Sequence, residues 1–178
     1  ATISPDGKYI VYALSDRSSQ SLYIRQVSTA NDKQIFAPAP VGVFGMTFSP
    51  DGTELYYALK ANLDAGTLYR IPVLGGTPVK VLEKIDAPIS FAPDGKQFVL
   101  VRGNYPNPGE SALVIANLDG SGERNLVVKK NSDRFSPIFF TGPSWSPDGK
   151  LIAATVARLG GRSKVVAFSA EDGSEKDF

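Results

Sequence analysis

The sequence predicts an all-β fold built from four small antiparallel sheets, on three observations. A Pro-Asp-Gly signature occurs four times, at Asp6, Asp51, Asp94 and Asp148, with spacings of 45, 43 and 54 residues. Strand-length apolar runs follow each copy, and they show no helical period. A four-stranded unit needs roughly 40–50 residues, so each copy predicts one such unit, and the longer third interval predicts an insertion of about ten residues.

The signature residues are expected to form tight hairpin turns. Proline presets φ at the first corner, aspartate can accept a hydrogen bond from the backbone two residues on, and glycine tolerates positive φ. Such a turn between two apolar strands predicts an antiparallel pair. The predicted turn residues are Pro5, Asp6, Gly7, Pro50, Asp51, Gly52, Pro93, Asp94, Gly95, Pro147, Asp148 and Gly149.

The strands of every repeat follow in the same order. An inner strand precedes the signature, and β-rich second strands contain 10–13, 55–58, 98–101 and 152–155. A polar or Gly/Pro-containing loop leads to a third strand, which begins at Leu22, Leu68, Leu113 or Val165. A turn and a short outer strand, such as 79–82 or 125–128, complete the unit. The predicted units cover approximately 1–37, 43–83, 87–129 and 143–178.

Small sheets of this kind bury enough apolar surface only by packing face to face, as in a β-propeller. Phe48, Phe91 and Trp145 stand at the predicted inner strands, and we expect them to pack between neighbouring units as core side chains. The predicted fold is therefore an all-β β-propeller of four four-stranded antiparallel blades, in a single domain over 1–178.

Composition excludes several classes of function. Nineteen basic residues balance eighteen acidic ones and are scattered, so nucleic acid is not an expected partner. The absence of Cys and His excludes a disulfide, a cysteine nucleophile, a Ser-His-Asp triad and a histidine zinc ligand within the chain. Apolar runs are strand-sized, so direct membrane insertion is not expected. The sequence opens inside a predicted strand, and we expect it to be part of a longer protein.

No motif predicts a metal site, a cofactor or a catalytic residue. Calcium needs about six to eight oxygens converging in one loop, whereas the signature aspartates lie in four separate turns, which favours turn capping. Asp119-Gly120-Ser121-Gly122 lacks the Lys-Ser/Thr of a phosphate-binding loop and predicts a turn. Composition allows Ser-Lys or carboxylate-pair catalysis, but no spacing supports either. We therefore expect no cofactor and no metal.

The signature and its following strand resemble the PD40, or WD40-like, repeat of TolB-type propellers, from Ile3 to about Asp172. The stretches 68–78 and 109–113 are similar to extracytoplasmic sensor propellers of bacterial membrane proteins that carry serine/threonine kinase or winged-helix domains. The resemblance implies a sensor or protein-binding role, a periplasmic or extracytoplasmic location, and a ring of six to eight blades. The four blades are then expected to be a partial or open portion of that ring, and open blade faces would allow self-association.

Similar propellers bind through loops on one face. The strand order places the variable loops opposite the signature turns, at 15–20, 60–66, 102–110 and 158–162, with 38–45 and 131–141 between blades. Arg and aromatic side chains there are frequent interface anchors, although aromatics more often cover a blade edge or the channel. The candidate binding residues are Arg102, Asn104, Tyr105, Arg134, Phe139, Phe140, Asn62, Asp64, Arg158 and Arg162.

The leading functional hypothesis is a non-catalytic protein- or ligand-binding module, the sensor or scaffold part of a larger bacterial membrane or envelope protein. Its expected partner is a protein or small ligand on the loop face. Two alternatives stay open: the gating propeller of an S9-type serine peptidase, and a structural self-assembly module in which two copies complete one ring. A downstream α/β-hydrolase segment with Gly-x-Ser-x-Gly would indicate the peptidase, and an upstream kinase domain would exclude it.

Overall fold

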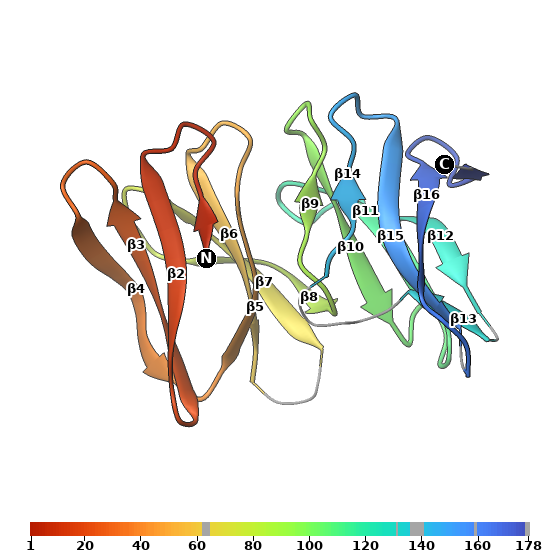
Figure 1. Cartoon of the computed structure of the whole chain (residues 1–178), viewed down its shortest axis with the longest axis horizontal. Coiled ribbons are helices and arrows are strands. Elements are labelled where there is room, and N and C mark those ends of the chain that lie inside the picture. The colour runs from red at the N-terminus through yellow and green to blue at the C-terminus, as the bar shows by residue number, and fades with distance from the viewer. Residues whose placement is uncertain (62–64, 131, 136–140, 159, 177–178) are drawn as a thin grey trace. The chain divides into compact units, whose positions relative to one another are not determined.

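A computed structural model of the chain describes residues 1–61, 65–130, 132–135, 141–158 and 160–176. Within these ranges the regular structure consists of β-strands (Figure 1). The described residues include no helix of the length and apolar character needed to cross a membrane. The chain forms two compact units, 1–83 and 84–178, and the all-β fold class predicted from the sequence is confirmed.

The first unit contains two four-stranded meander sheets in which strands adjacent in sequence pair antiparallel. The first sheet comprises β1 (Thr2–Ile3), β2 (Tyr9–Asp16), β3 (Ser19–Gln26) and β4 (Asn31–Ala39). The second comprises β5 (Gly42–Phe48), β6 (Glu54–Lys60), β7 (Gly66–Pro72) and β8 (Val79–Ile85), whose last residues pass the boundary between the units.

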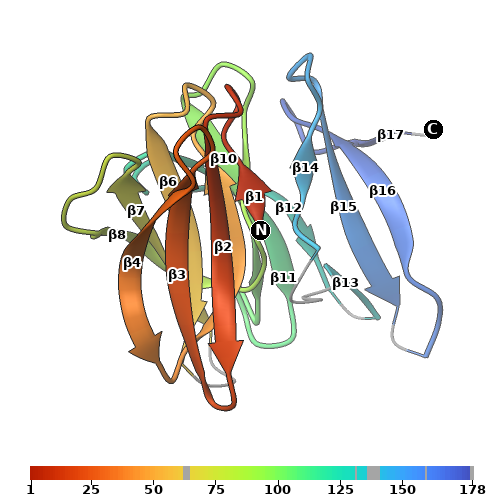
Figure 2. The ribbon, with the colours of Figure 1, turned by 60° about the vertical axis from the view of Figure 1, so that its left-hand side comes forward.

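The second unit repeats this plan with one irregularity. Its first sheet comprises β9 (Ser90–Phe91), β10 (Gln97–Gly103), β11 (Ser111–Asn117) and β12 (Arg124–Lys129). Its second sheet comprises β13 (Asp133–Phe135), β14 (Ser144–Trp145), β15 (Leu151–Arg158), β16 (Lys164–Ser169) and β17 (Glu175–Lys176). Figure 2 shows β14, β15 and β16 as one layer.

Two short strands share the inner position of this last sheet. β14 pairs with β15 at Trp145 and Ile152, while β13 pairs with the far end of β15 at Phe135 and Val156. β13 comes from the insertion of the third repeat interval and precedes the range 143–178 assigned to the fourth blade from the sequence. Part of the insertion therefore forms a strand that pairs with β15, and the insertion is not only a loop.

The four signatures form the turns between the inner and second strands. Their glycines have φ between 68 and 74. Each glycine N–H donates to the carbonyl three residues earlier, at 2.8–2.9 Å, which closes the turn. Each aspartate Oδ1 accepts from the backbone N–H two residues on, at 3.0–3.1 Å.

The serine before the proline is a partner that the sequence interpretation missed. Ser49 Oγ donates to Asp51 Oδ1 at 2.6 Å and accepts from the Glu54 N–H at 3.0 Å, so one hydroxyl ties the aspartate to the following strand. Ser4 and Ser146 do the same, whereas the third turn has Ala92 at this position.

Each unit has a core between its two sheets. In the first unit Val11 and Leu22 pack in one cluster with Leu55, Tyr57 and Ile71 of the facing sheet. In the second, Val99 and Leu113 share a cluster with side chains of β15 and β16, among them Ile152 and Phe168. Alternate residues of each strand supply these faces, as a pleated strand requires. The two sheets of each unit thus pack face to face like consecutive propeller blades.

Candidate ligand-binding sites

Arg102 is held inside the second unit. The side chain lies on β10 and is buried, and its guanidinium forms a two-pronged ion pair with Glu123, in which Nη2 lies 2.9 Å from Oε1. Its Nε donates to the Lys84 carbonyl at 3.1 Å, and its Cζ lies 5.1 Å from the centre of the Tyr105 ring. This candidate residue therefore links β8, the residue before β12 and the loop after β10, with little of its side chain open to a ligand.

The loop that follows Arg102 is organised by its own hydrogen bonds. Asn104 adopts φ +51 and its Oδ1 accepts from the Gly109 N–H at 3.2 Å. Asn107 Nδ2 donates to Glu110 Oε2 at 2.8 Å, and Tyr105 N–H donates to the Glu110 carbonyl at 3.2 Å. The half-buried Tyr105 ring and the exposed Asn104 are thus placed on a preformed loop.

The candidate loops 102–110 and 131–141 meet at Arg134. A Cβ built on Gly109 would lie 3.6 Å from Arg134 Nη2, so the guanidinium lies next to this loop. The neighbouring Phe135 is core, because it is buried and packs edge-on against Phe168 at 5.7 Å between ring centres. Four of the candidates, Phe139, Phe140, Asn62 and Asp64, lie outside the described residues.

Arg158 and Arg162, the last two candidates, line a cavity of about 240 Å³ at the end of β15. Asp133, Val156 and Lys164 complete its lining. The cavity lies where β15 ends and β16 begins, near the pair Val156 and Lys164. Three cationic side chains therefore surround one carboxylate.

The charges of this cavity are only partly matched. Arg158 Nε donates to Asp133 Oδ1 at 2.8 Å and Nη2 to Oδ2 at 3.3 Å. These hydrogen bonds lower the pKa of Asp133 and raise that of Arg158, so the pair stays ionised. Within the described part of the chain, no ion pair joins Arg162 or Lys164 to a carboxylate. The cavity thus has an excess of positive charge that suits an anionic group.

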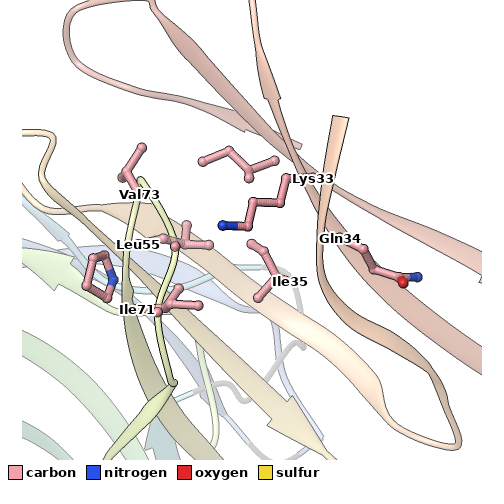
Figure 3. A pocket seen from close by; sticks show the side chains of 10 residues that line it. Lys33, Gln34, Ile35, Leu55, Ile71 and Val73 are labelled. Carbon is pink, nitrogen blue, oxygen red and sulfur yellow. The ribbon is translucent and has the colours of Figure 1, made fainter. Parts of the chain in front are cut away.

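A second cavity, which no sequence motif indicated, lies in the first unit. It has a volume of about 80 Å³ and is lined by β3, β4, β6, β7 and the turn after β7. Figure 3 shows the apolar side chains of Ile35, Leu55, Ile71 and Val73 around it, with Lys33 extending among them. The only sequence signal near it is Gly75-Gly76, which predicts a turn and gives no sign of a cavity.

In the described residues, no three His, Cys, Asp or Glu side chains gather in a way that could hold a metal ion. The signature aspartates instead bind their own turns, as described above.

Comparison with solved structures identifies the fold. TolB from Acinetobacter baumannii matches with a TM-score of 0.74 at 22% identity, over 97% of this chain and 41% of that chain. A putative TolB from Agrobacterium tumefaciens matches with a TM-score of 0.68 at 22% identity, over 98% and 58%. A putative dipeptidyl aminopeptidase IV from Bacteroides ovatus matches with a TM-score of 0.70 at 17% identity, over 98% and 32%.

The chain has the fold of a TolB-like β-propeller, and the resemblance seen in its repeats is confirmed at the level of the fold. It spans 41% and 58% of the two TolB chains, and about a third of the peptidase. No family model matches the chain, and neither does any curated protein sequence.

Proposed function

We propose that the chain is a non-catalytic binding module and that the cavity beside Arg158 and Arg162 holds an anionic group of its ligand. The observation that carries this proposal is the charge of the cavity, whose described lining contains the cations Arg158, Arg162 and Lys164 and one carboxylate, that of Asp133. A cationic hollow at the end of a rigid sheet supplies directed hydrogen bonds to a carboxylate or phosphate.

The test is a titration of the full chain with inorganic phosphate and with succinate, followed by backbone NMR shifts. Saturable shifts are expected at residues 158 and 160–164. Arg162→Gln combined with Lys164→Gln should weaken binding at least tenfold, because both unpaired charges are removed. Lys8→Gln combined with Lys80→Gln is the matched control, since these two exposed lysines lie in the first unit. Equal binding by both double variants would refute the proposal.

The setting that we propose for this module is extracytoplasmic, in a larger bacterial membrane or envelope protein, with the four blades as part of a larger ring. The likeness of the repeats to sensor propellers, and of the fold to TolB, supports this setting. Fractionation of cells that express the complete protein tests it, and a cytoplasmic protein would contradict it.

The second candidate function is the gate of a serine peptidase. It is favoured by the structural match to a putative dipeptidyl aminopeptidase IV. A Gly-x-Ser-x-Gly segment of an α/β-hydrolase in the same gene would establish this function, and its absence would remove it.

Self-association through sheet faces is a further proposal. Ile3 and Leu14 of the first sheet and Val165 of the last one are large apolar side chains, each more than half exposed. Such side chains favour contact with another apolar surface. Light scattering should give a mass above that of the monomer at high concentration, and Leu14→Ser should lower it. A monomer mass throughout would contradict this proposal.

A further inference from the structure

The apolar cavity of the first unit has the size of one aliphatic side chain. Its volume of about 80 Å³ is about half of the roughly 150 Å³ that holds benzene in an engineered protein cavity. It therefore suits a group of about three or four carbons. Ile24, Ile35, Leu55, Ile71 and Val73 form the apolar part of the wall, which an aliphatic group would contact. The rest of the lining comes from Lys33, Gln34, Pro72, Gly75 and Gly76.

Lys33 is the one cationic side chain among the described residues that line this cavity. Lys33 of β4 donates to the Leu74 carbonyl at 3.2 Å and thereby crosses from the first sheet to the turn between β7 and β8. Figure 3 shows its amine among the cavity walls, whereas Gln34 points away. Lys33 also lines an adjoining hollow of about 180 Å³, which shares Ile24 and Val73 with the cavity.

The charge of Lys33 is not matched by a carboxylate in the described residues. The nearest candidate in the sequence, Asp32, is already held by Arg25, with hydrogen bonds of 2.8 and 2.6 Å, and by the Tyr12 hydroxyl at 2.8 Å. A ligand that carries a carboxylate next to an aliphatic group would therefore match both the ammonium and the apolar walls.

The second unit contains an equivalent junction. There the outer strand β12 supplies Arg124, whose Nη2 donates to the Ala170 carbonyl at 2.9 Å, as Lys33 does to Leu74. A Cβ at Gly173, in the turn after β16, would meet the Leu126 carbonyl oxygen at 2.4 Å, so the turn lies directly on β12. In the first unit a Cβ at Gly75 would likewise meet Lys33 Nζ at 2.0 Å, so in both units the turn after the third strand contacts the outer strand of the preceding sheet.

The strand beside the cavity has a free edge. Among the described residues, β4 is the last strand of its sheet and pairs with β3 alone, and its residues 31–34 are exposed. Unpaired backbone groups at a sheet edge can pair with an extended peptide. The carboxylate is therefore more favourably supplied by a peptide, whose backbone can pair with this edge, than by a small free acid.

We propose that this cavity binds the C-terminal residue of a peptide or protein partner. The aliphatic side chain of a terminal Leu, Ile or Val enters the cavity, the terminal carboxylate pairs with Lys33, and the preceding residues extend along the free edge of β4. The site is separate from the cationic cavity of the second unit and so goes beyond the proposed function.

The test is a methyl and backbone NMR titration of the full chain with an acetylated hexapeptide that ends in Ser-Val-Leu. Saturable shifts are expected for the methyl groups of Ile24, Ile71 and Val73. The same peptide with a C-terminal amide should bind at least tenfold more weakly, because it lacks the charge that pairs with Lys33.

Two variants separate the role of Lys33 from a general charge effect. Lys33→Met keeps the length of the side chain and should weaken binding of the free-acid peptide at least tenfold, while leaving binding of the amide unchanged. Lys80→Met removes an exposed charge elsewhere in the unit and should bind like the unaltered chain. The Arg162→Gln/Lys164→Gln variant should also bind the peptide normally, which distinguishes this site from the proposed function.

Three results would overturn the proposal: equal binding of acid and amide, an unchanged affinity of Lys33→Met, or unperturbed methyl groups around the cavity at millimolar peptide. A fourth would be binding of 4-methylpentanoate as tight as that of the peptide, since the site would then accept a free acid without contribution from β4.

Discussion

The hydroxyl of Ser49 lies 2.6 Å from Oδ1 of Asp51, and it accepts a hydrogen bond from the N–H of Glu54, the first residue of β6. This hydrogen bond is the largest cause of the lowered pKa of Asp51. Three of the four signature turns contain such a pair, and the third contains Ala92 instead. The third turn therefore serves as a natural comparison for how much this hydroxyl contributes to stability.

We expect Ser49→Ala to lower the free energy of unfolding by about 1 kcal/mol, the usual net value of a buried hydrogen bond. Ala92→Ser should raise it by about the same amount, because the third turn already has Asp94 in place to accept the new hydroxyl. Urea unfolding followed by circular dichroism measures both. Opposite signs for the two substitutions are required; a loss of stability in Ala92→Ser would contradict the role given to the serine.

Acid should destabilise the turns between about pH 4 and pH 2. Hydrogen bonding with Lys8, and then with Ser4, lowers the pKa of Asp6 to about 2, and hydrogen bonds from Ser174 lower that of Asp172 to about 2. Because these values lie below those of the unfolded chain, the stabilisation is complete above about pH 4. It is lost as the pH falls toward 2.

Acid unfolding of the double variant Asp6→Asn/Asp172→Asn measures this effect. The variant should be less stable than the unaltered chain at pH 7, and the difference should disappear near pH 2. A difference that stays constant over this range would show that the two carboxylates contribute no pH dependence.

The pair between Arg102 and Glu123 should stabilise the second unit. The Arg102 side chain is 9% exposed and that of Glu123 is 32% exposed. We expect Glu123→Ala to cost roughly 2–3 kcal/mol, below the roughly 3–5 kcal/mol of a fully buried pair, because water still reaches one partner. Thermal unfolding measures the loss. Glu83→Ala, in an exposed pair with Lys80, is the control and should cost below about 1 kcal/mol.

This pair also tests whether Arg102 acts in binding. Glu123→Gln should lower stability while leaving the affinity for any ligand of the 102–110 loop unchanged, provided that Arg102 is structural. If Glu123→Gln instead lost affinity for the ligand while its stability stayed unchanged, Arg102 would be a binding residue.

Gly173 is expected to tolerate no side chain, in contrast to Gly7. Both have φ +72, but a Cβ at Gly7 meets no atom within 4 Å, whereas one at Gly173 meets the Leu126 carbonyl oxygen at 2.4 Å. Gly7→Ala should cost about 1–2 kcal/mol from backbone strain alone. Gly173→Ala should cost about 1–3 kcal/mol more from the steric overlap. Equal losses in urea unfolding would mean that the turn moves freely away from β12.

The repeats show how far local chemistry can be read from the sequence. A Pro-Asp-Gly turn is closed by atoms within six residues, and an apolar face follows from alternation along one strand, so the turns, strand order and sheet packing could be anticipated. The two-part inner position of the last sheet could not, because the pairing of Phe135 with Val156 depends on where the insertion returns to β15.

The sequence by itself determined an all-β chain of four meander sheets with tight turns between their strands, because each of these features depends on neighbours along the chain. Only the tertiary structure decided that Arg102 is buried against Glu123, that Arg158 and Arg162 share a cavity with Asp133, and that Lys33 stands at an apolar cavity. The physical reason is that an ion pair or a cavity is defined by side chains from separate strands, and their distance depends on sheet register and packing that no single segment encodes.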